Sequence, residues 1–144
     1  MKISTKGRYA LRLMLELAMS DQNRPMRIRE IAEKQNISDK YLEQIISVLN
    51  KAGFVRSIRG PQGGYLLTRS PAEYTAGDIL RLTEGSLVPV DCADSSLLDC
   101  PRVEQCATNI LYKRLYEAIN GVVDSVTLEN LRDWQIARNG DYSI

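Results

Sequence analysis

The stretch NISDKYLEQIISVLNKAGFVRSIRGPQGGYLLTR, residues 36–69, decides the fold. Its first half predicts a helix, because Ser38 is placed to cap the start and Gly53 to end it. Apolar residues at helical spacing form one stripe for burial, namely Leu42, Ile45, Ile46 and Leu49. The opposite face is polar and consists of Lys40, Glu43, Gln44, Ser47 and Lys51. The segment therefore predicts an amphipathic helix with an exposed polar face.

A shorter helix is predicted just before it, over IREIAEKQ, residues 28–35. Two helices joined by a turn of three or four residues are typical of a helix-turn-helix. Any small helical bundle has the same periodicity, so this pattern alone leaves DNA binding open. An earlier helix is indicated by an apolar stripe that stops before the turn at residues 21–25, made of Ala10, Leu13, Met14, Leu17 and Ala18.

The second half of the stretch predicts a β-hairpin. Residues 54–59 alternate apolar and polar side chains, GPQGG interrupts the alternation, and YLLTR resumes it. A hairpin directly after a helix-turn-helix is a wing, and cations that a structural hairpin would not need stand in it, namely Arg56, Arg59 and Arg69. The glycines at 60, 63 and 64 permit positive φ and a close approach to a nucleic-acid backbone. The alternative is that they only build a long turn.

The net charge of +1 hides an asymmetry along the chain. Residues 1–70 hold 13 Lys and Arg against 6 Asp and Glu, or +7, whereas residues 71–144 hold 6 against 12, or −6. The first half is suited to an anionic partner, and the phosphate backbone fits because neutralising phosphates releases condensed counterions. The other interpretation is a basic face that is merely solvated.

The composition limits the class of protein. A length of 144 residues allows one domain, or a small domain with an oligomerising appendage. No stretch reaches the ~18 apolar residues of a membrane span, the start does not resemble a signal peptide, and the odd cysteine count argues against a secreted disulfide framework. We expect a cytoplasmic protein with reduced thiols. Without histidine, a phosphate-binding glycine loop or a catalytic acidic pair, an enzyme with a small-molecule substrate is not expected.

The longest helical signal lies near the C-terminus. Between residues 102 and 126, apolar side chains recur at helical spacing over roughly 36 Å at 1.5 Å per residue, namely Leu111, Leu115, Ala118, Ile119, Val122, Val123 and Val126. A second copy of this helix would bury the excess and give a two-fold dimer. The alternative is packing on its own domain. Before the long helix, Thr75 is expected to cap a short helix that Gly85 closes. After the long helix, Thr127 is expected to cap a terminal helix that packs beside it.

The three cysteines are spaced Cys-x7-Cys-x5-Cys and include no CxxC pair. Pro101 suits the first helical position, which places Cys100 near the N-cap of the long helix and Cys106 within its second turn. The helix dipole there favours thiolates, which suit an iron-sulfur cluster. Zinc, cluster-free redox thiols and ordinary buried cysteines are the alternatives. Because the chain has no histidine, a fourth ligand must be an oxygen, a water or an external thiol.

Together, ISTKGRYALRLML, SDKYLEQI, VRSIRGPQGGYLL and the three cysteines resemble the Rrf-two family of winged-helix regulators, and within it the iron-sulfur cluster regulators. The resemblance implies a homodimeric bacterial transcription factor, mainly α with a small β-hairpin wing. We therefore expect a winged helix-turn-helix DNA-binding domain in residues 1–84, a cluster-binding loop in residues 85–102, and a dimerisation helix with a short C-terminal helix in residues 103–144.

The resemblance also implies how double-stranded DNA is read at a pseudo-palindromic operator. The third helix would enter the major groove and Arg59 would reach the minor groove. Gln44 can pair with adenine, Glu43 can accept from cytosine, and arginine favours a narrow minor groove. The expected DNA-binding residues are Lys40, Glu43, Gln44, Ser47, Arg56, Arg59, Gly60 and Gln62.

The implied cofactor is an iron-sulfur cluster, 2Fe-2S rather than 4Fe-4S, on Cys92, Cys100 and Cys106. Where the iron-sulfur branch has a histidine past the third cysteine, this chain has Asn109, and where a nitric oxide-sensing branch has an aspartate near the N-terminus, it has Arg8. We therefore expect a carboxylate as the fourth ligand.

The candidate carboxylate of interest is Glu43, because it lies in the reading helix, although Asp91, Asp94 and Glu104 are nearer in sequence. The expected function is a nucleoid-associated repressor of iron-sulfur biogenesis-type genes whose cluster state controls DNA binding. The alternative is a cluster-free regulator on the same scaffold that responds to thiol oxidation or nitric oxide.

Overall fold

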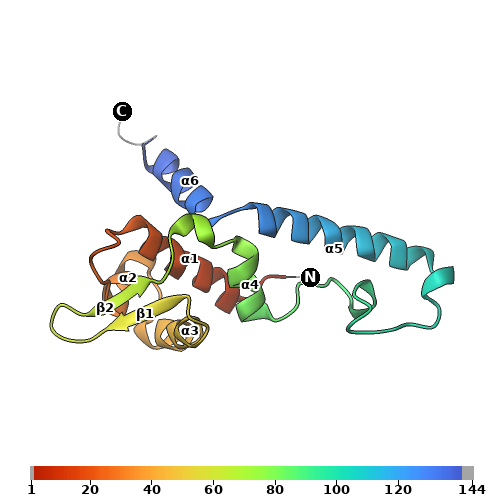
Figure 1. Cartoon of the computed structure of the whole chain (residues 1–144), viewed down its shortest axis with the longest axis horizontal. Helices are drawn as coiled ribbons and strands as arrows, with labels where there is room; N and C mark the ends of the chain where they lie inside the picture. The colour runs from red at the N-terminus through yellow and green to blue at the C-terminus, as the bar shows by residue number, and fades with distance from the viewer. Residues whose placement is uncertain (1, 141–144) are drawn as a thin grey trace.

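A computed structural model describes residues 2–140 (Figure 1). The ends of two predicted ranges, residue 1 and residues 141–144, lie outside the described residues. The helices and strands are α1 Thr5–Met19, α2 Ile28–Gln35, α3 Asp39–Lys51, β1 Val55–Ile58, β2 Gly64–Leu67, α4 Ala76–Glu84, α5 Ala107–Ser125 and α6 Leu128–Gly140, with 3-10 turns η1 Pro71–Glu73, η2 Asp91–Ala93 and η3 Val103–Gln105. The predicted fold class, mainly α with a hairpin wing, is confirmed.

The helix-turn-helix forms where the sequence predicts it. Asn36 takes a left-handed backbone conformation with φ of 55°, which ends α2 and turns the chain sharply. Ser38 then caps α3, its Oγ accepting from the backbone N–H of Tyr41 at 3.2 Å. The predicted stripe of α3 is buried in the core, namely Leu42, Ile45, Ile46 and Leu49. The polar face of α3 consequently faces outward.

The hairpin is fixed to the core at its base. Strands β1 and β2 are antiparallel, with Val55 opposite Leu67. The buried hydroxyl of Tyr74 donates to the Phe54 carbonyl at 2.7 Å and accepts from the backbone N–H of Thr68 and Arg69. Arg69, which we expected to serve as a wing cation, is exposed and stacks on Tyr74, its Cζ 4.6 Å from the ring centroid.

Helix α5 begins later than predicted. Residues 103–105 form the separate turn η3, and Cys106 has an extended backbone, with φ of −103° and ψ of 102°, and caps the helix. The buried Asn109 side chain donates to the Cys92 carbonyl at 2.8 Å, which holds the first turn of α5 against η2. This contact between distant residues sets the start of the helix, so α5 has 19 residues, about 28 Å, rather than 36 Å.

Helix α6 also lies elsewhere than predicted. It packs chiefly against α1 and η1 rather than beside α5, and Figure 1 shows the two helices running in different directions. Leu128 is fully buried and Leu131 packs against the same core as α1. Leu128 and Leu131 therefore attach α6 to the core that contains α1, while α5 extends away from it.

Candidate nucleic-acid interface and cysteine segment

The outward face of α3 carries the four side chains expected to meet DNA. Lys40, Glu43, Gln44 and Ser47 are all exposed, and their spacing places them on one side of the helix. The neighbouring hairpin packs against α3 through β1, and Figure 1 shows the two elements side by side. Arg56, Arg59, Gly60 and Gln62 are likewise exposed on it. The structure therefore brings the predicted DNA-binding residues to one end of the molecule.

The wing is held in one orientation by the residues that precede α2. Met26 forms an antiparallel bridge with Tyr65, with N–H to carbonyl distances of 3.0 and 2.8 Å. The Arg27 guanidinium donates to the carbonyl of Pro61 at the tip of the hairpin. Sequence reasoning missed both residues, because one bridging residue leaves no periodic pattern. The glycine-rich loop was the one available sign that another backbone comes close.

The cations of this interface have no acidic partner in the part of the chain that the structure describes. Lys40, Arg56 and Arg59 form no ion pair within residues 2–140. An exposed cation without an intramolecular carboxylate can neutralise a phosphate without first breaking an internal contact. The arrangement can therefore bind an anionic backbone at the wing while the uncharged Gln44 and Ser47 face base edges.

The three cysteines lie in the segment that leads into α5. Cys92 lies in η2, Cys100 precedes η3, and Cys106 caps the helix, so the expected positions of Cys100 near the cap and Cys106 in the second turn are wrong. All three are partly buried free thiols. A hydrogen bond with the Thr108 hydroxyl, 3.2 Å away, and then one with the backbone of Asn109 lower the pKa of the Cys106 thiol. The lowered pKa favours the thiolate form of Cys106.

The expected fourth ligand is not close to these cysteines. Figure 1 shows α3, which carries Glu43, in a different part of the chain from residues 91–106. Within residues 2–140, no group of three His, Cys, Asp or Glu side chains is close enough to hold a metal ion. Asp94 is engaged locally, since its carboxylate accepts from the backbone and hydroxyl of Ser96, which lowers its pKa. The donor types suit a cluster, but one chain does not assemble them.

No helix in the described part of the chain is long and apolar enough to cross a membrane.

The Rrf2 family, described as iron-dependent transcriptional regulators, matches residues 3–133. The regulator CymR of Bacillus subtilis is 44% identical over 134 residues, which cover 93% of this chain and 91% of CymR.

Solved structures agree with these matches. The structure of B. subtilis CymR, described as a global cysteine regulator, has a TM-score of 0.77 at 42% identity and covers 93% of this chain and 98% of its own. That of T. potens IscR has a TM-score of 0.75 at 39% identity, with 95% and 90% covered. The matched family and these relatives are regulators and not enzymes.

Proposed function

The chain belongs to the Rrf2 family of transcriptional regulators, and from that premise we propose that it is a homodimer that reads double-stranded DNA with α3 and the wing. The observation that carries the proposal is the exposed polar face of α3 beside a wing whose orientation is fixed by Met26 and Arg27. A rigid wing beside an exposed recognition helix can contact a groove and its phosphates together. The chain would act in the bacterial cytoplasm, associated with the nucleoid when DNA-bound.

Each predicted contact has a chemical role at the operator. Gln44 would pair with adenine and Glu43 would accept from cytosine in the major groove, with Lys40 and Ser47 beside them. Arg59 would enter the minor groove, while Arg56 would neutralise phosphate. Gly60 and Gln62 would bring the wing backbone close to the DNA. In this proposal residues 1–84 read DNA, residues 85–102 carry the sensing loop, and residues 103–144 hold the dimerisation and terminal helices.

The dimer is supported by the apolar side chains that α5 leaves exposed. Leu111 is 53% exposed and Val122 is 63% exposed, and both lie on the side of the helix that the DNA-binding part does not cover. Leu115, at 36% exposure, lies between them. A second copy of α5 would cover this stripe and place two α3 helices on one pseudo-palindromic operator.

We further propose that Cys92, Cys100 and Cys106 hold an iron-sulfur cluster, of the 2Fe-2S type, and that its presence controls repression of iron-sulfur biogenesis-type genes. Three free, partly buried thiols in the segment that leads into α5 and the relatedness to IscR support this assignment. The chain would gain the cluster when iron is available and lose it when iron is scarce or oxidants are present. Ligation by Glu43 would require the Glu43 of a second copy, because α3 lies away from the cysteines of its own chain.

The second candidate is a cluster-free thiol regulator, including one that responds to nitric oxide. It is favoured by the lowered pKa of the Cys106 thiol, which raises the reactive thiolate fraction, and by the relatedness to CymR, described as a cysteine regulator. Both candidates use the same DNA-binding surface, so they differ only in the chemistry at the cysteine segment.

Anaerobic purification followed by iron and sulfide analysis separates the two candidates. We expect about two iron and two sulfide per chain and a coloured protein, both lost in the Cys106→Ser variant. Glu43→Gln should alter the visible spectrum if this carboxylate is a ligand, whereas the matched change Glu33→Gln on α2 should leave it unaltered. A colourless, iron-free chain with three titratable thiols would select the thiol regulator.

Replacing Arg59 with alanine should weaken operator binding by roughly ten- to a hundredfold and lower the salt dependence by about one phosphate contact. The side chain is exposed on the wing and forms no ion pair within residues 2–140. Fluorescence anisotropy over a salt series would measure both effects. Arg138→Ala on α6 is the matched control, since it removes the same charge away from the wing. Equal affinity of Arg59→Ala and wild type would refute the wing assignment.

A further inference from the structure

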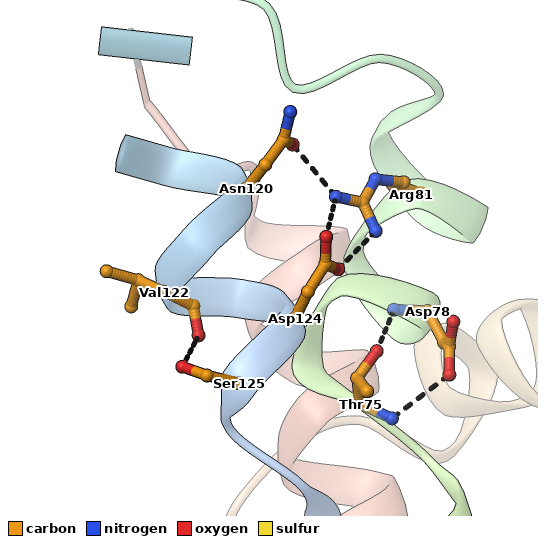
Figure 2. Close-up of polar contacts among 7 residues, drawn as sticks. All are labelled: Thr75, Asp78, Arg81, Asn120, Val122, Asp124 and Ser125. Carbon is orange, nitrogen blue, oxygen red and sulfur yellow. Dashed lines mark hydrogen bonds and ion pairs between the residues drawn. The ribbon is translucent and has the colours of Figure 1, made fainter. Parts of the chain in front are cut away.

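Helix α5 is joined to the DNA-binding part by a polar contact with α4 (Figure 2). Arg81 on α4 donates from Nη1 to Oδ1 of Asp124 at 2.6 Å and from Nη2 to Oδ2 at 3.0 Å. The same Nη2 also donates to Oδ1 of Asn120 at 2.8 Å. The hydrogen bonds between Arg81 and Asp124 raise the pKa of Arg81 and lower that of the Asp124 carboxyl. We call Arg81, Asn120 and Asp124 the α4–α5 joint.

A glycine beneath the joint allows the two helices to come this close. A Cβ on Gly77 would overlap both Oδ1 of Asp124 and Nη1 of Arg81. Gly77 itself is buried within the first turn of α4, where glycine is a poor helix former. Close helix approach gives a physical reason for this residue, because any larger side chain would push Asp124 away from Arg81.

The backbone below the joint reinforces the same geometry. The N–H of Ala76 donates to the carbonyl of Val126 at 2.8 Å, and that of Leu128 donates to the carbonyl of Tyr74 at 2.9 Å. The segment entering α4 and the segment leaving α5 therefore pair like two short strands, with a bridge between Thr75 and Thr127. Backbone pairing fixes the end of α5, and the joint fixes its direction within the last two turns of the helix.

The last turns of α5 contact α4 on one side and leave an apolar side chain exposed on the other. Asn120 and Asp124 are four residues apart and point toward α4, as Figure 2 shows. Val122, between them in sequence, is 63% exposed on the other side of the helix. A second copy that covers Val122 would thus pack on α5. The joint sets the angle between α5 and the DNA-binding part of the same chain, which we call the reading head. A bidentate guanidinium–carboxylate pair suits this role because it restricts rotation as well as distance.

We infer that Arg81 and Asp124 are positioning residues that set the angle between the two reading heads of the dimer and thereby the half-site spacing that it accepts. The inference rests on the proposed DNA-binding dimer. The ion pair is partly exposed, with 36% and 48% of the two side chains accessible, so its contribution to overall stability is small. Its loss should therefore change which operators are accepted more than whether the chain folds.

The test uses DNA fragments that the wild-type dimer selects from a random pool. Derived fragments have one base pair inserted between the half-sites, which moves one half-site by about 3.4 Å and roughly 35°, and a third fragment contains a single half-site. Wild type should bind the original fragment at least about tenfold more tightly than the lengthened one. Asp124→Asn should reduce this ratio to about threefold or less, with half-site affinity within about twofold of wild type.

Two further variants make the test specific. Gly77→Ala should lower the spacing ratio as Asp124→Asn does, although it leaves both charges in place. Glu129→Gln, which removes the ion pair with Arg132 on α6, should keep the wild-type ratio. Circular dichroism and light scattering confirm that each variant is a folded dimer, and Arg81→Lys replaces any that is not, because lysine cannot make both contacts.

The outcomes distinguish this inference from the proposal beneath it. A wild-type chain that selects no DNA would refute the proposed function. Wild-type selection with no spacing preference, or an unchanged preference in the folded Asp124→Asn and Gly77→Ala dimers, would overturn the role of the joint and leave DNA binding intact. Equal loss of half-site and full-site affinity would also overturn it, because that pattern indicates damage to the reading head.

Discussion

A chain with Leu111→Glu and Leu115→Glu should be a monomer that binds its operator about a hundredfold more weakly than wild type. These side chains are 53% and 36% exposed in one chain and lie in the stripe assigned to the second copy. Carboxylates there would have to be desolvated without a partner when the dimer forms, which is strongly unfavourable. A monomer then loses the advantage of two linked half-site contacts, worth about 2.7 kcal/mol for a hundredfold change.

The measurement combines light scattering with binding to full and half operators. Affinity for a single half-site should be unchanged, because the substitutions lie in α5, which extends away from α3 and the wing (Figure 1). Lys113→Glu is the control, since it adds a carboxylate on another side of α5. A double variant that stays dimeric at micromolar concentration would show that the exposed stripe of α5 is not the dimer surface.

Replacing Gly64 by alanine should destabilise the fold by about 3 kcal/mol or more and misplace the wing. Gly64 has a φ of 151°, and a Cβ there would lie 2.5 Å from the carbonyl carbon and oxygen of Met26. Because the obstacle is backbone, it cannot be relieved by a rotamer change. Separation of the two segments would break the Met26–Tyr65 bridge, so operator affinity should fall together with the free energy of unfolding.

Gly60→Ala isolates the clash from the backbone strain. Gly60 has a φ of 107°, but no atom lies within 4 Å of the position that a Cβ would take, so its variant should lose only about 1–2 kcal/mol. Urea unfolding of both variants gives the comparison. Equal losses would mean that the approach of Met26 is not what requires glycine at position 64.

The parts of the fold that depend on nearby residues could be predicted from the sequence. Ser38 and the stripe beginning at Leu42 define α3 within its own length, and the alternation after Phe54 defines the hairpin. The start of α5 could not be predicted, because it depends on Asn109 reaching the carbonyl of Cys92. The spacing of apolar residues predicted that α6 is a helix, but it could not predict that α6 packs on α1. Periodicity identifies the buried face of a helix without identifying what covers that face.

The candidate site divides in the same way. Exposure of Gln44 follows from the pattern of α3, and that of Arg59 from the alternation over residues 54–59. Neither Arg27 at the wing nor the pair of Arg81 and Asp124 could be recognised, because their partners are far away in sequence. Gly77 likewise could not be recognised as the site of a close helix contact, because its neighbour Asp124 is far away in sequence.

The core of the N-terminal part of the chain is completed by Leu128, a residue that follows α5. This folding unit is therefore built from two segments that are separate in sequence. Leu128 is fully buried in the core that also contains Tyr74 and α1, so α5 and the cysteine segment form an excursion between two pieces of a single folding unit. A fragment cut after α4 would leave the site of Leu128 empty, at a cost of about 2–5 kcal/mol. The segments before α5 and after it therefore form one cooperative unit, and a truncation after α4 should not yield an independently stable domain.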